Sequence, residues 1–193
     1  MRLWTIQPET IYAILKSQKL IYCDPLKSDL LTECGFGSSY DWMVNQMKMR
    51  IGNPPNGVNY PIWAWHTVDW KHQKPDLRKM EFRNYKGNRV CIELEMPDDK
   101  VLLSDEEMWH FVLNDYFIGD SENEEDFDAE DNWYNKLPEQ QQKTVKENSW
   151  EKIFDVSEPI NTEWKRKGMF IQATFWELDF KYVVDVRNFK GRK

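Results

Sequence analysis

The sequence is poor in cysteine and glycine and has no long apolar stretch. Its 193 residues include 3 Cys and 8 Gly. An odd cysteine count without a CxxC pair argues against a disulfide scaffold and is typical of a reducing compartment. No run of 18 apolar residues is present, which excludes a membrane-spanning helix. The opening MRLWTIQPET lacks the basic flank and apolar core of a signal peptide. We therefore expect a cytoplasmic protein with no membrane partner.

Several motifs of nucleotide-binding and catalytic proteins are also missing. There is no Walker loop and no GxGxxG, which argues against a conventional kinase, GTPase or Rossmann site. There is no GxSxG turn for a serine nucleophile. His66, Asp69 and His72 are spaced three apart, but their segment does not have a helical pattern and has no cysteine nearby. We therefore predict no metal site.

The formal net charge of −7 comes from one segment. Residues 120–131, DSENEEDFDAED, hold eight acidic side chains and no basic one. Without those eight, 25 of the 33 acidic residues remain against 26 basic ones. We predict a single domain over residues 1–193 with an acidic, loosely ordered insert at about 119–148. The insert is either a solvated loop or an arm that binds a basic partner.

Hydrophobic periodicity predicts strands and helices in irregular alternation. Ser104 and Glu107 match a capping box before a helix. The expected strands are 2–7, 61–68, 89–97, 170–178 and 181–189, with 101–103 as a possible extension of the sheet. The expected helices are 8–18, 38–50, 105–114 and 149–155. Because no regular βαβ pattern occurs, we predict an α+β fold with a mixed, largely antiparallel sheet and flanking helices.

Charged side chains suggest two further sites. Glu93 and Glu95 lie on one face of a predicted strand, roughly 7 Å apart, a spacing open to paired carboxylates of a glycosidase or a nuclease. The alternative is a solvent-facing sheet surface. In KPDLR, Arg78 or Lys74 is a candidate phosphate ligand. The alternative there is a surface ion pair with Asp76.

Aromatic residues are the strongest compositional signal, with 10 Trp, 8 Tyr and 10 Phe. Trp63 and Trp65 share a strand face and are candidates for the wall of a cleft that holds a flat ring, although most such rings belong to a core. Uncharged polar side chains also alternate into predicted strands. These are Thr5 with Gln7, and Gln172 with Thr174. They require hydrogen-bond partners when buried, from neighbouring backbone or from a ligand.

Nearly the whole chain resembles an uncharacterised bacterial family of unknown function. The matching blocks are LWTIQP, QMKMRIGNPP, YPIWAW, KPDLR, VLLSD and QATFWEL, in that order. This resemblance implies no activity.

A second resemblance is to ADP-ribosyltransferase-like domains. The opening LWTIQPETIYAILKSQKLIY is similar to their first strand and helix, with Thr5 at the family's His position and Gln7 at its Thr position. YPIWAW is similar to the second strand, and FIQATFWEL places Gln172 near the catalytic Glu position. The resemblance implies a split sheet whose cleft binds NAD and transfers ADP-ribose to a protein or nucleic acid. Because the usual His and Glu are both absent, another carboxylate, such as Glu93, would have to assist Gln172.

Two functions follow as hypotheses. The first is an ADP-ribosyltransferase-like domain that binds NAD or a related nucleotide. It assigns Gln172 and Glu93 to chemistry and six residues to the ligand: Thr5, Gln7, Trp63, Trp65, Arg78 and Thr174. The second is a non-catalytic interaction module, for example a partner of a toxin or phage-response protein, that uses the acidic insert.

Overall fold

A six-stranded sheet organises the molecule. The computed structural model describes residues 1–28, 31 and 34–191, apart from the side chain of Arg83. The sheet has the order β5-β6-β3-β1-β4-β8, and a small second sheet pairs β2 with β7. The strands are β1 (Arg2–Pro8), β2 (Leu20–Tyr22), β3 (Ile62–Val68), β4 (Asn88–Glu95), β5 (Leu102–Asp105), β6 (Phe170–Phe175), β7 (Glu177–Asp179) and β8 (Val183–Lys190).

The α+β class is confirmed, and the sheet is simpler than predicted. All strand pairs between described residues are antiparallel, so no mixed pairing occurs in that part of the chain. The strand predicted over 170–178 is divided into β6 and β7 at Trp176. The Trp176 indole is buried and donates a hydrogen bond to the Gly52 carbonyl at 2.9 Å, and at this residue the chain passes from the six-stranded sheet to the two-stranded sheet.

Periodicity predicts half of the described α-helices, and the helix predicted at 149–155 is a 3₁₀ turn. The described α-helices are α1 (Glu9–Gln18), α3 (Gly37–Ile51), α4 (Met80–Arg83), α5 (Glu106–Leu113), α6 (Glu124–Tyr134) and α7 (Glu139–Ser149), with short 3₁₀ turns at Pro25–Lys27 and Trp150–Phe154. The predicted capping box is wrong by one residue. Asp105 is the N-cap of α5, and its carboxylate accepts from the Met108 amide at 3.1 Å. Ser104 stays in β5, paired with Gln172.

The two faces of the sheet pack against different elements. On one face, Leu3, Ile92 and Phe175 form a buried core with Leu15 of α1. On the other, Trp63 and Leu102 pack with α3, α5 and the 150–154 turn. A smaller cluster around Phe82 covers the end of β3 and β6. Strand residues alternate between these cores because successive side chains of a strand point to opposite faces.

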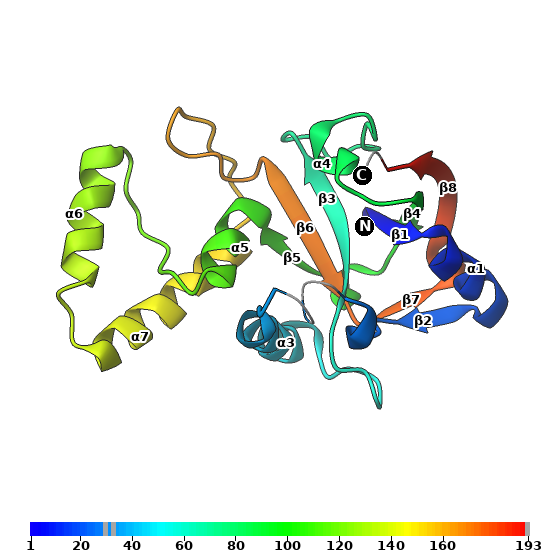
Figure 1. The fold of residues 1–193 in the computed structure, drawn as a ribbon, viewed down its shortest axis with the longest axis horizontal. Coiled ribbons are helices and arrows are strands. Elements are labelled where there is room, and N and C mark those ends of the chain that lie inside the picture. The colour runs from blue at the N-terminus through cyan, green and yellow to red at the C-terminus, as the bar shows by residue number, and fades with distance from the viewer. Residues whose placement is uncertain (29–30, 32–33, 192–193) are drawn as a thin grey trace.

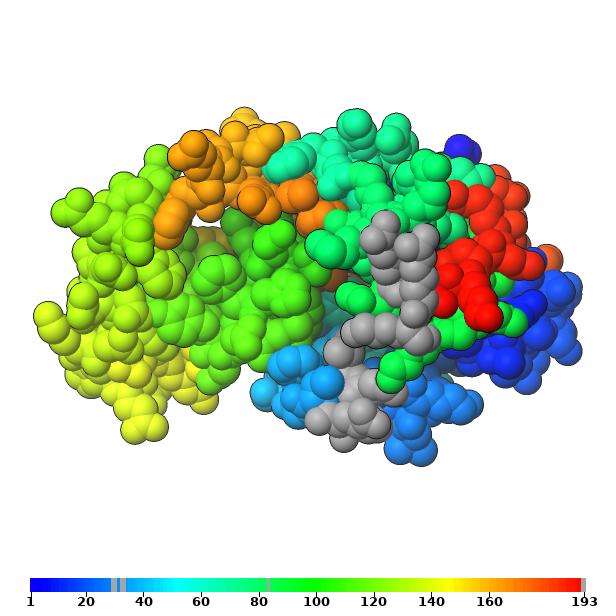
Figure 2. Space-filling view, turned by 45° about the horizontal axis from the view of Figure 1, so that its top comes forward, coloured from blue at the N-terminus to red at the C-terminus, as the bar shows by residue number. Residues whose placement is uncertain are grey.

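The predicted insert contains two helices, α6 and α7. The Asn123 side chain caps α6 by accepting from the Asp126 amide at 2.9 Å, and acidic residues in the first turn suit the positive end of the helix dipole. Pro138 precedes the first residue of α7. Composition suggested disorder, but these capping residues favour helix. Helices α6 and α7 lie at one end of the molecule, away from α1 and β8 (Figures 1 and 2).

None of the described helices combines the length and the apolar character that crossing a bilayer requires.

Candidate functional site

The sheet opens at the junction between β1 and β3. These strands share one register pair, Trp4 with Trp65, whereas β1 pairs with β4 along its whole length. Beyond that pair, the Trp63 carbonyl accepts a hydrogen bond from the Thr5 hydroxyl at 2.8 Å. A side chain therefore takes the place of a backbone donor, and the strands separate without leaving this carbonyl unsatisfied.

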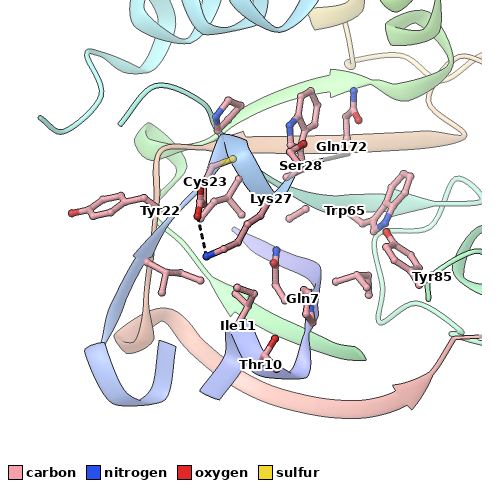
Figure 3. A pocket seen from close by; sticks show the side chains of 18 residues that line it. Gln7, Thr10, Ile11, Tyr22, Cys23, Lys27, Ser28, Trp65, Tyr85 and Gln172 are labelled. Carbon is pink, nitrogen blue, oxygen red and sulfur yellow. Dashed lines mark ion pairs between the residues drawn. The ribbon is translucent and has the colours of Figure 1, made fainter. Parts of the chain in front are cut away.

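A cavity of about 460 Å³ occupies this opening. Its walls come from β1, α1, the segment from β2 to the 25–27 turn, β3, β6 and Tyr85 (Figure 3). Gln7 and Gln172 lie on opposite sides in this view, with Lys27 between them (Figure 3). The volume is within the range of small-molecule sites, about 300–1,000 Å³. Of the eight residues assigned to a site from sequence, the cavity brings together Gln7, Trp63, Trp65 and Gln172.

Two buried hydrogen-bond donors belong to the walls of this cavity. The Nε1 atom of Trp63 and the Nε2 atom of Gln172 have no hydrogen-bond partner among the described residues. The Gln172 side chain is buried, with the residue only 7% exposed. An unsatisfied buried donor costs about 1–3 kcal/mol. Both atoms belong to residues that line the cavity, and neither atom is itself accessible to solvent.

Thr5 fixes how Gln7 is oriented. The Thr5 hydroxyl has one proton, which it donates to the Trp63 carbonyl, so toward Gln7 it acts as an acceptor. Gln7 accordingly donates from Nε2 to Thr5 at 2.8 Å and keeps its own carbonyl oxygen as an acceptor. Thr5 is fully buried and does not line the cavity. It is a positioning residue and not the direct ligand contact predicted from sequence.

Lys27 places a positive charge at the cavity, and this residue was not predicted from sequence. Lys27 ends the short 25–27 turn, and its ammonium lies 2.9 Å from the Asp24 carboxylate. Hydrogen bonding from Lys27 lowers the pKa of Asp24. The sequence DPLK is typical of a helix start, because Asp precedes Pro. In the structure, Asp24 caps this turn by accepting a hydrogen bond from the Leu26 amide.

Aromatic rings form the wall beside β3. Trp65 packs edge-on against Phe82 and Phe170, with ring centroids 6.3 and 6.0 Å away. Tyr85 hydrogen-bonds with Trp65, and burial raises the pKa of its phenol. Nothing in the sequence around Tyr85 distinguished it from a core aromatic. The rings give the cavity a rigid apolar side suited to a flat ring.

Glu93 does not belong to this cavity, which corrects its pairing with Gln172. Their strands, β4 and β6, are three positions apart in the sheet, about 14 Å at the usual strand spacing. Glu93 is 8% exposed and lies 3.4 Å from Arg2 and 3.5 Å from Lys74. Glu95, in contrast, is exposed. The solvent-facing alternative thus holds for Glu95 only, and ion pairing accounts for the buried carboxylate of Glu93.

Arg78 and Thr174 also lie outside the cavity lining. Arg78 forms a local ion pair in which both its backbone amide and its guanidinium bind Asp76, the alternative interpretation from sequence. This pairing lowers the pKa of Asp76 to about 2. Thr174 is fully buried in the sheet and donates to the Leu102 carbonyl at 3.3 Å. Arg78 is thus bound by a carboxylate two residues away, and Thr174 by a backbone carbonyl of the adjacent strand, which a sequence pattern does not reveal.

The histidines pair with each other. His66 and His72 stack with ring centroids 3.9 Å apart. Asp69, predicted on spacing as their neighbour, is ion-paired with Lys79. Across the described residues, no three His, Cys, Asp or Glu side chains gather as a metal site.

The fold and cavity define an α+β protein with a ligand-sized cleft at the opening of an antiparallel sheet. The chain belongs to the family described as Domain of unknown function (DUF3841), whose model matches residues 2–184. No curated protein and no solved structure matches the chain. The predicted family of unknown function is confirmed, and the comparisons give no support to the resemblance to ADP-ribosyltransferases.

Proposed function

We propose that the cleft between β1 and β3 binds NAD or a related nucleotide. The observation that carries this proposal is the pair of unpartnered buried donors, Trp63 Nε1 and Gln172 Nε2, on one cavity. Ribose, phosphate and carboxamide oxygens are all acceptors that such donors bind. Aromatic rings on the adjacent wall suit a nicotinamide or adenine ring.

The remaining contacts follow from charge and position. Lys27 takes the role that sequence reasoning gave to Arg78, because its ammonium stands at the cavity and is exposed enough to meet a phosphate. Gln7 contributes its carbonyl oxygen as an acceptor. Trp63 and Trp65 form the wall.

The proposed function is binding, without transfer of ADP-ribose. Asp24 is the one carboxylate among the described lining residues, and it is paired with Lys27. Gln172 cannot accept a proton as a base at neutral pH or place a full negative charge beside a developing cation. The described side chains therefore support recognition of the ligand better than cleavage of its glycosidic bond.

Thermal shift with two glutamine variants tests this proposal. NAD at 100 times its Kd stabilises the folded protein by about 2.7 kcal/mol. Gln172→Met keeps the volume and removes the donor, so the shift should fall strongly. Gln46→Met is the matched control, since Gln46 is equally buried on α3 and away from the cleft. Equal shifts in all three proteins, or no shift in the wild type at millimolar NAD, would contradict the proposal.

A second candidate function uses α6. This helix carries acidic side chains along its exposed length at the end of the molecule remote from β8, and Trp133 is 51% exposed on it. The arrangement favours a basic protein partner, as the interaction-module hypothesis requires. A triple change of Glu124, Glu125 and Asp128 to Gln, Gln and Asn should reduce binding to a poly-lysine peptide at low salt. Unchanged binding would argue against this function.

A further inference from the structure

The chain of hydrogen bonds from Trp63 through Thr5 to Gln7 determines which end of the Gln7 amide is available to a ligand. The Trp63 carbonyl accepts from Thr5, and Thr5 accepts from Gln7. Reversing the Gln7 amide would set its oxygen against the Thr5 hydroxyl oxygen, whose proton is already used. Turning the Thr5 proton instead would leave the Trp63 carbonyl without this partner. Gln7 is therefore held with its carbonyl oxygen as the free end.

The residues that line the cavity consequently carry hydrogen-bonding groups of opposite kinds. Trp63 Nε1 and Gln172 Nε2 are donors without partners among the described residues. The Gln7 oxygen is an acceptor on the same cavity. A neutral carboxamide matches both, because its oxygen accepts and its NH₂ donates. A carboxylate in the same place has two acceptor oxygens and no proton for Gln7.

We propose that Gln7, oriented by Thr5, makes the cleft selective for a ring bearing a neutral carboxamide over the corresponding carboxylate. This inference rests on the proposed function and deepens it by naming the group that the cleft distinguishes. Gln7 is the specificity-determining contact, and Thr5 acts only through it. One mismatched hydrogen bond corresponds to a preference of about tenfold.

The test compares the Kd of NAD with that of nicotinic acid adenine dinucleotide by calorimetry. The two molecules differ only in carboxamide against carboxylate, so any partial loss of folding cancels in the ratio. The wild type should prefer NAD about tenfold. Gln7→Met and Thr5→Val should both bring the ratio toward 1, whereas Thr5→Ser keeps the hydroxyl and should keep the ratio.

The outcomes separate the two proposals. Equal affinity for the two dinucleotides in the wild type, or a preference for the acid, overturns the inference and leaves the binding function standing. A preference that survives both Gln7→Met and Thr5→Val also overturns it. If neither molecule binds the wild type, the proposed function itself fails.

Discussion

Two strand junctions of the same sheet satisfy their backbone hydrogen-bonding groups in different ways. Between β1 and β4 the ladder is continuous from Arg2 to Pro8, and the core beneath it is filled. Between β1 and β3 the ladder has one register pair. Beyond that pair, the Thr5 hydroxyl donates a hydrogen bond to the Trp63 carbonyl. The comparison shows that two strands can separate and form a cleft where a polar side chain hydrogen-bonds to a backbone carbonyl that has no partner in the neighbouring strand.

The largest expected difference between the junctions is in packing. Leu94→Ala removes a fully buried side chain from the closed junction and should cost about 2–5 kcal/mol of unfolding free energy. Ile11→Ala on the cleft wall removes a side chain that is only partly buried, and it should cost less than half of that. Urea unfolding measures both. Equal costs would mean that the open junction is packed as tightly as the closed one.

Loss of the hydroxyl at the open junction has the next largest effect. Thr5→Val leaves the Trp63 carbonyl without this donor and should destabilise the protein by about 1–3 kcal/mol. Thr5→Ser keeps the hydrogen bond and should cost less. Denaturant unfolding of the two variants gives the comparison. If Val and Ser behave alike, the hydroxyl does not sustain the separation of the strands.

Removing an unsatisfied donor should stabilise the ligand-free protein. Gln172→Met eliminates the buried Nε2 atom and should raise the unfolding free energy by about 1 kcal/mol. Gln46→Met loses a hydrogen bond to Arg50 and should not stabilise. Calorimetric melting without ligand distinguishes them. A destabilised Gln172→Met protein would show that Gln172 serves packing and not a ligand.

The last difference depends on pH and concerns a bulge at the far end of β3. The ladder with β6 shifts between Trp65 and Thr67, at His66. Burial first, then His72, lowers the pKa of His66 to about 4. In the unfolded chain the pKa of this histidine is near 6.5, so between pH 6.5 and 4 the unfolded state binds more protons than the folded state. The free energy of unfolding should therefore fall as the pH drops from 6.5 to 4. His66→Gln should flatten this part of the melting-temperature profile, and an unchanged slope would exclude His66 as its cause.

Sequence patterns predicted the strands better than the site. Alternation located β1, β3 and β4, because apolar side chains at alternate positions of these strands face one buried core. The prediction for residues 119–148 came from composition alone and did not use Asn123 and Pro138, which directly precede α6 and α7. Gln7, Trp63, Trp65 and Gln172 were identified because polar and aromatic groups alternate into buried strands.

The rest of the site depends on contacts between distant segments. Tyr85 is not distinguished by its neighbours in sequence. DPLK indicates a turn at Lys27 but not a cavity, so both residues reach the cavity only through the fold. Glu93 was assigned to chemistry because of its spacing from Glu95 and because the family's catalytic Glu is absent. Its ion pairs come from Arg2 and Lys74, on other segments, which no local pattern shows.

Calorimetric titration of the wild-type protein with NAD tests the central claim most directly. The account predicts saturable binding at one site per chain, with heat that is lost in Gln172→Met and retained in Gln46→Met. Absence of binding at millimolar NAD, or binding that Gln172→Met leaves intact, would contradict a nucleotide cleft at the opening between β1 and β3.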